Sequence, residues 1–171
     1  MRASVLAIVI SVAALGCSPP DEPIAAADSS GLEGAWRVVW AEDRLENGEV
    51  ASYPWGRHPV GLVLIDSGHI SIQIVSRDRP AWPPPESSPD EMKEALEKQL
   101  GSYIAYFGSY TVDEAEGSLS IEVQGGWRPS YAGTKQKRYY ELAGDRLTIG
   151  PAPRVVEGRQ TVRRVLMERI R

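Results

Sequence analysis

From Gly34 onward, the sequence is a series of short segments in which apolar and polar residues alternate. In 118–124, for example, Leu119, Ile121 and Val123 alternate with polar residues. A period of two places the apolar side chains on one face of a β-strand, and strands with one polar face belong to antiparallel sheets. Several such segments separated by turn residues predict an all-β sandwich or barrel. The eight predicted strands are 35–45, 61–66, 69–77, 106–113, 118–124, 134–142, 145–149 and 160–170.

Within the first predicted strand, Trp36, Val38 and Trp40 are expected on one face. Three pairs of neighbouring strands are expected to form hairpins across short turns, because Ser67-Gly68 and Ala143-Gly144 are typical turn residues. For the last strand, the alternation does not decide which of its two faces points inward. Val162 and Leu166 share a face with Arg164 and Glu168, whereas Val165 and Met167 share the other with Arg163 and Arg169.

One segment, 88–101, has a helical rather than a strand pattern. Ser88 can cap a helix, Pro89 suits its first position, and Glu91 completes a capping box. Met92, Leu96 and Leu100 then recur every four residues, which predicts an amphipathic helix of about three turns that ends near Gly101. Because the helix follows the proline-rich stretch 79–87, we expect it to close one end of the β domain; the alternative is packing on the outside.

The N-terminus has the pattern of an export signal. Residues 1–16 contain a positive start, an apolar core and small residues before Cys17. The apolar run is too short to cross a bilayer, which takes about 20 residues. The segment Ala14-Leu15-Gly16-Cys17 resembles the lipobox of bacterial lipoproteins, which implies cleavage before Cys17 and its acylation. The alternative is an ordinary signal peptide followed by an incidental cysteine.

Residues 18–31 are rich in proline, alanine, serine and acidic residues, which is typical of a flexible tether. The expected organisation is therefore a signal peptide at 1–16, a lipidated Cys17 with its tether at 17–31, and a folded domain at 32–171. The expected location is the cell envelope. Within the resemblance to lipoproteins, Ser18 in place of an aspartate favours the outer membrane.

Composition excludes several classes of protein. The chain has 19 lysines and arginines against 23 aspartates and glutamates, a net charge of −4, and no evident basic face. Nucleic acid is therefore not an expected partner, because phosphate contacts need a basic face. Cys17 is the single cysteine in the sequence, so no internal disulfide can form. A domain of about 140 residues can bury enough surface to fold without a metal or disulfide.

The sequence contains no evident catalytic or metal-binding pattern. Of the two histidines, His58 is expected in a loop and His69 at a strand start, on the face opposite the neighbouring isoleucines. No cluster has metal-ligand spacing, and we expect no cofactor. Acidic pairs such as Asp43 and Glu46 are expected in turns, in contact with water. A cofactor-free cyclase or isomerase remains a minor alternative.

Inward-facing polar residues on 134–142 suggest a binding site instead. One face of that strand carries two lysines and Glu141, which must face water, so Gln136, Arg138 and Tyr140 face inward. Tyr106 and Tyr110 are expected to share the same interior. An apolar pocket with one fixed cation and several phenols is typical of a small-molecule site. The alternative is a structural Arg138 near the barrel mouth that reaches solvent. The candidate ligand-binding residues are Gln136, Arg138, Tyr140, Tyr106 and Tyr110.

Several motifs resemble the bacterial lipocalin-like domain family over about residues 32–170. Gly34-Ala35-Trp36 looks like the Gly-x-Trp signature of lipocalins. The other motifs that carry the resemblance are Ser52–Gly56, Gly61–Leu64, Gly68–Ser71, Arg77–Pro80, Tyr103–Val112, Gly133–Gln136, Arg138–Leu142 and Gly144–Thr148.

The resemblance implies an eight-stranded antiparallel up-and-down β-barrel with an interior cavity, and it implies no particular reaction. Arg169 matches an arginine that packs on the signature tryptophan in lipocalins, so Trp36 and Arg169 are expected to form a structural pair. The leading hypothesis is a membrane-tethered binding protein for a small amphipathic or hydrophobic molecule, possibly anionic, held under a lid at 79–101. The second is a filled barrel that serves as a protein-interaction domain at the envelope.

Overall fold

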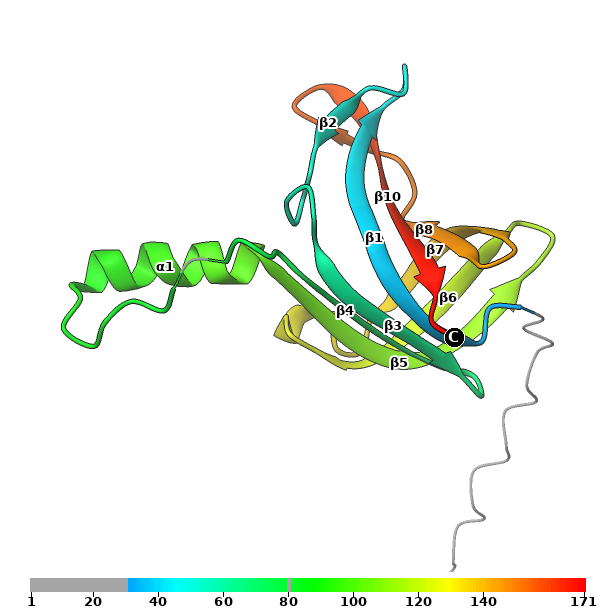
Figure 1. Ribbon diagram of the computed structural model, residues 1–171, viewed down its shortest axis with the longest axis horizontal. Coiled ribbons are helices and arrows are strands. Elements are labelled where there is room, and N and C mark those ends of the chain that lie inside the picture. Colours follow the sequence, from blue (N-terminus) through cyan, green and yellow to red (C-terminus); the bar gives the residue numbers. More distant parts are fainter. Residues whose placement is uncertain (1–30, 80) are drawn as a thin grey trace, which may run out of the picture.

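The computed structural model describes residues 31–79 and 81–171, and eight of its strands close into one antiparallel barrel (Figure 1). Each strand pairs with the next in sequence, and β10 pairs back with β1. The predicted eight-stranded up-and-down barrel is thus confirmed. The barrel strands are β1 (Gly34–Leu45), β3 (Val60–Asp66), β4 (His69–Val75), β5 (Tyr103–Asp113), β6 (Ser118–Gly126), β7 (Lys135–Ala143), β8 (Arg146–Gly150) and β10 (Arg159–Arg169).

Two short strands extend this barrel at one rim. β2 (Val50–Ser52) pairs with β1, and β9 (Arg154–Val156) pairs with β10. They flank the paired far ends of β1 and β10, which rise above the rest of the barrel in Figure 1. We call this end of the barrel the mouth, and the end where β1 begins and β10 stops the base.

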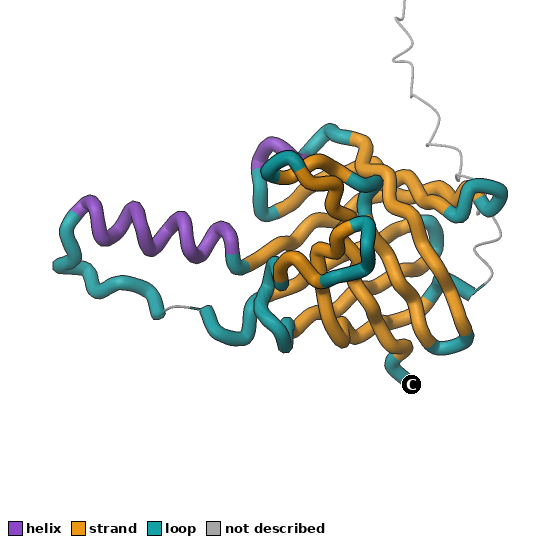
Figure 2. Tube along the Cα trace, turned by 90° about the horizontal axis from the view of Figure 1, so that it is seen from above, coloured by secondary structure: helices purple, strands orange, loops and turns teal. Residues whose placement is uncertain are grey.

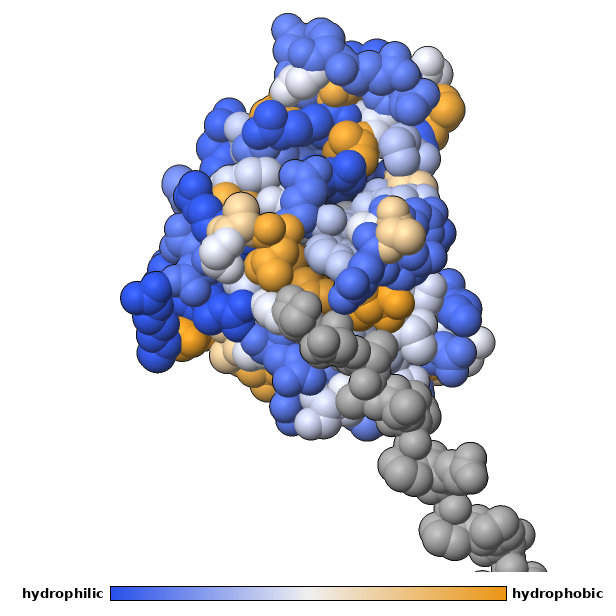
Figure 3. Space-filling model, turned by 90° about the vertical axis from the view of Figure 1, so that its right-hand side faces the viewer, coloured by the Kyte–Doolittle hydropathy of each residue, from blue (hydrophilic) through white to orange (hydrophobic). Residues whose placement is uncertain are grey.

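The barrel interior is formed by the alternating apolar residues. Ile70, Ile72 and Ile74 of β4 are buried, as are Leu119 and Ile121 of β6. Fully burying such a side chain contributes roughly 1.5–3 kcal/mol. The outer face carries the polar residues of the same strands, and the side of the molecule shown in Figure 3 is mostly hydrophilic, with apolar residues gathered near its centre.

The base is closed by Trp36 and Arg169. Trp36 is fully buried, and its indole Nε1 donates a hydrogen bond to the carbonyl of Leu32 at 2.9 Å. The Arg169 guanidinium lies 4.1 Å from the centre of the Trp36 ring and donates to the carbonyls of Gly31 and Glu33. These contacts join the start of β1 to the end of β10, so the described chain enters the fold at the base.

A β-bulge in β1 changes which residues face inward. The register between β1 and β10 shifts between Val38 and Trp40, and beyond it Ala41 and Asp43 are buried. The extra residue reverses the alternation, because a slip of one residue turns every later side chain to the opposite face. The expectation that Trp40 shares the face of Trp36 and Val38 is therefore wrong. Trp40 lies half-buried, and the Arg44 guanidinium is 5.5 Å from the centre of its ring.

Because of the bulge, the expectation that Asp43 is in contact with water is also wrong. This carboxylate, expected on a solvated turn, is only 7% exposed. It faces the arginines at the barrel mouth.

A 3₁₀ turn, η1 (Pro129–Tyr131), and one helix, α1 (Pro89–Gly101), complete the described elements. The helix begins with the predicted capping box: the Ser88 hydroxyl accepts from the amide of Glu91, and the Glu91 carboxylate accepts from the amide of Ser88. α1 projects away from the barrel and leads directly into β5 (Figures 1 and 2).

The expectation that this helix closes a barrel end is therefore wrong, and so is the alternative of packing along the outside. Leu96 and Leu100 are 40% and 44% exposed, whereas Met92, Ala95 and Gln99 are the more buried residues. The cause is the chain path: residues 81–87 run away from the barrel beside the helix, and α1 then returns toward the barrel at β5 (Figure 2).

The expected signal peptide, the lipidation at Cys17 and nearly all of the tether lie outside the described residues. Within 31–79 and 81–171, no helix has the length and apolar character needed to cross a membrane.

Candidate functional site

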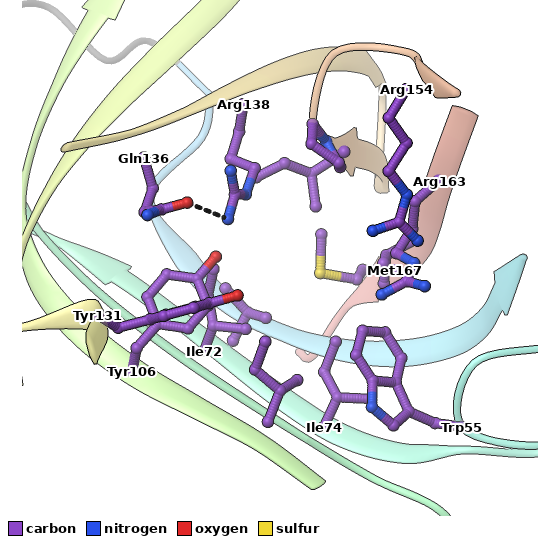
Figure 4. Close-up of a pocket in the computed structure, with 16 residues that line it drawn as sticks. Trp55, Ile72, Ile74, Tyr106, Tyr131, Gln136, Arg138, Arg154, Arg163 and Met167 are labelled. Carbon is purple, nitrogen blue, oxygen red and sulfur yellow. Dashed lines mark hydrogen bonds between the residues drawn. The ribbon is translucent and has the colours of Figure 1, made fainter. Parts of the chain in front are cut away.

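The barrel contains a cavity of about 260 Å³ toward the mouth, lined by sixteen residues (Figure 4). Most of its wall is aliphatic, with Ile72 and Ile74 from β4 and Met167 from β10. Among the described residues that line it, the charged ones are three arginines, Arg138, Arg154 and Arg163, and none is acidic. The interior is therefore an apolar space with a positive charge excess.

Arg138 lies on the inward face of β7, as predicted. Its guanidinium donates to the Gln136 side-chain oxygen at 3.1 Å and to the Lys137 carbonyl at 2.8 Å. It lies 5.8 Å from the centre of the Tyr106 ring. No carboxylate of the described residues forms an ion pair with it. Arg138 therefore carries its charge into the cavity without a counter-ion.

Two phenols lie beside Arg138. Tyr106 is buried, and its ring packs edge-to-face on Tyr131 with 5.7 Å between the ring centres. Burial raises the pKa of Tyr106 above its ordinary value, although the charge and hydrogen bond of Arg138 oppose the change. Its phenol therefore stays protonated at neutral pH.

A second cationic group lies at the mouth and is built around Asp43. Arg163 donates to both Asp43 carboxylate oxygens, at 2.7 and 2.8 Å, and the Ser52 hydroxyl donates to the same carboxylate at 3.0 Å. Arg154 lies 3.6 Å from it. Burial raises the pKa of Asp43, but the hydrogen bonds and charge of Arg163, helped by Ser52 and Arg154, hold it below its ordinary value. The Arg163 guanidinium also lies 5.2 Å from the centre of the Trp55 ring.

Three of the five candidate residues line the cavity: Arg138, Gln136 and Tyr106. Tyr110 and Tyr140 face inward but lie closer to the base and do not line it. The Tyr110 hydroxyl is buried without a hydrogen-bond partner among the described residues. Burial raises the pKa of Tyr140, and the nearby acidic residues Glu114 and Asp113 raise it further.

Four polar or aromatic lining residues were missed: Trp55, Tyr131, Arg154 and Arg163. Arg163 shares the inward face with Val165 and Met167, which was one of the two possibilities left open for the last strand. Trp55 and Tyr131 lie in connections between barrel strands, and Arg154 lies in the short β9. Strand alternation gives no signal for these three.

A family model described as a lipocalin-like domain matches residues 33–169, which span the whole barrel. The chain belongs to the lipocalin-like domain family. Comparisons with curated proteins and with solved structures found no match. Lipocalin-like barrels generally bind small hydrophobic ligands, because eight strands enclose just enough space for one.

The described residues contain no cluster of three or more histidine, cysteine, aspartate or glutamate side chains able to hold a metal ion. His58 and His69 are both exposed and do not line the cavity. The arrangement at the cavity is thus suited to holding a molecule through arginines, phenols and an apolar wall.

Proposed function

We propose that this lipocalin-like protein is anchored in the cell envelope through Cys17 and binds one small apolar molecule that carries an anionic group. The observation that carries the proposal is the cavity itself, in which the charged lining residues of the described chain are all arginines. An open cavity favours ligand binding over the filled-barrel, protein-interaction alternative.

Arg138 supplies the anion-binding group. A half-buried guanidinium without a carboxylate partner is costly, and a ligand carboxylate would offset that cost. Hydrogen bonds between charged groups are roughly twice as strong as neutral ones and give the ligand a fixed orientation. The neighbouring Tyr106, whose phenol is protonated at neutral pH, adds a donor beside the guanidinium.

The cavity volume limits the size of the ligand. The cavity measures about 260 Å³. Pockets for drug-sized ligands typically measure about 300–1,000 Å³. The proposed ligand is therefore a single-ring acid or a short-chain acid rather than a long-chain lipid.

The position of the chain entry suits a tethered binding protein. The described chain begins at Gly31 beside Arg169, at the base, whereas the cavity lies toward the mouth. An anchor attached through the preceding residues leaves the mouth at the opposite end from the attachment point. The ligand would then enter from the aqueous side, and in a cell with two membranes the favoured site is the outer membrane.

Titration calorimetry with the full chain tests the binding proposal. Wild type is titrated with para-tolylacetate and with its methyl ester, and the same is done for Arg138→Met. Charge-assisted hydrogen bonds contribute roughly 1.5–3 kcal/mol, so the variant should bind the acid about tenfold more weakly or worse. Binding of the ester should change little. Equal binding of acid and ester by both proteins would show that Arg138 does not contact the ligand's acid group.

A further inference from the structure

The cavity has a cationic group on each of two opposite sides. Figure 4 shows Arg138 and Gln136 on one side with Tyr106 and Tyr131, and Arg154 and Arg163 on the other with Trp55. Arg138 leans toward Gln136 and Tyr106, whereas Arg163 leans toward Asp43 and Trp55. The guanidinium groups therefore diverge.

Strand order sets the distance between the two sides. Arg138 is on β7 and Arg163 on β10, and these strands flank β8. The strand register places Arg138 and Arg163 next to Pro151, because Tyr139 pairs with Gly150 and Val165 pairs with Ile149. Neighbouring strands lie about 4.8 Å apart, so the two backbones are separated by roughly 10 Å. A short molecule can reach from one cationic side to the other.

Both sides keep a positive charge. On the Arg138 side no described carboxylate opposes the guanidinium. On the other side, Asp43 balances Arg163, and Arg154 remains as a second cation. The side chain of Arg154 is 51% exposed, and its guanidinium makes no hydrogen bond with the described residues beyond its long 3.6 Å ion pair with Asp43.

The space between the two sides is apolar. Met167 lies between Arg138 and the Arg154–Arg163 pair in Figure 4, and Ile72 and Ile74 form the wall beneath it. A polar or charged middle segment of a ligand would lose its hydration there without gaining a partner. The lining thus matches a molecule with an acid at each end and a hydrocarbon body.

We propose that the preferred ligand class is a short dianion, such as an aromatic dicarboxylate, with one acid on Arg138 and the other on Arg154. This inference rests on the proposed function and makes it more specific. Arg163 acts as a positioning residue: it holds Asp43, and Asp43 in turn keeps Arg154 at the rim.

The test compares three ligands of one skeleton by titration calorimetry with the full chain: para-phenylenediacetate, its monomethyl ester and para-tolylacetate. Wild type should bind the diacid at least tenfold more tightly than either monoacid, a difference of about 1.4 kcal/mol. In Arg154→Met this advantage should disappear while the monoacids bind as before. Because Arg154 is half exposed, the variant should fold, which circular dichroism checks.

Arg37→Met is the matched control. It removes the same charge from an exposed outward-facing arginine near the base, so it should leave the diacid preference intact. A diacid that binds no better than its half-ester would overturn the dianion proposal while leaving the proposed function in place. Equal weakening of all three ligands by Arg154→Met would also overturn it. If no acid of the series binds to wild type, the proposed function itself fails.

Discussion

Asp43→Asn tests the ion pair between Asp43 and Arg163 at the barrel mouth. The substitution keeps the shape of the side chain but removes the charge that Arg163 contacts through two hydrogen bonds. Removing one partner of a buried ion pair costs about 3–5 kcal/mol. Because the Arg163 side chain is 23% exposed and water can partly replace the carboxylate, we expect a loss of about 2–3 kcal/mol.

Urea unfolding followed by tryptophan fluorescence gives the free energy of unfolding, and a thermal melt gives an independent value. For a domain of about 140 residues, 2–3 kcal/mol corresponds to a decrease in Tm of roughly 7–10 °C. Asp66→Asn is the control, because Asp66 ends β3 in an exposed position. It should change the free energy of unfolding by less than about 0.5 kcal/mol.

The pH dependence provides a further check. The pKa of Asp43 is lowered in the folded state, so its contribution to stability is present above the unfolded value of about 3.9 and is lost as pH falls through the folded value. The difference between wild type and Asp43→Asn should therefore shrink in acid. A loss at neutral pH no larger than that of Asp66→Asn would refute the buried pair.

Three other predictions test the base, the helix and the anchor. Trp36→Ala should cost about 3–5 kcal/mol in urea unfolding because the ring is fully buried, and a loss below about 1 kcal/mol would contradict its role at the base. Leu96→Lys combined with Leu100→Lys should change the free energy of unfolding by under about 1 kcal/mol, since both side chains are exposed; a larger loss, or a changed ligand affinity, would indicate that α1 covers the barrel. Cys17→Ser should move the protein from the membrane fraction to the soluble fraction or leave the precursor uncut, and a mature, membrane-bound variant would exclude lipidation at Cys17.

The fold could be predicted because alternation is a local property that the barrel uses directly. Most of the eight segments have one apolar face, and closing the sheet buries these faces together. The bulge could not be predicted in this way. One extra residue in β1 has no compositional mark, yet it turns Trp40 out and Asp43 in.

The candidate site was predictable only in part, for a related reason. Alternation correctly placed Arg138 and Gln136 on the inward face, but it gives no information on depth along the barrel axis. Tyr110 and Tyr140 also face inward and lie below the cavity. The helix shows the same limit: its capping box is local and was found, whereas its direction depends on the chain path around it.

A crystal structure of the full chain with para-phenylenediacetate tests the central claim most directly. The account predicts the ring between Ile72 and Met167, with one carboxylate about 3 Å from the Arg138 guanidinium nitrogens. A ligand bound on the outer surface, or a ligand inside the barrel whose carboxylates avoid Arg138, would contradict it.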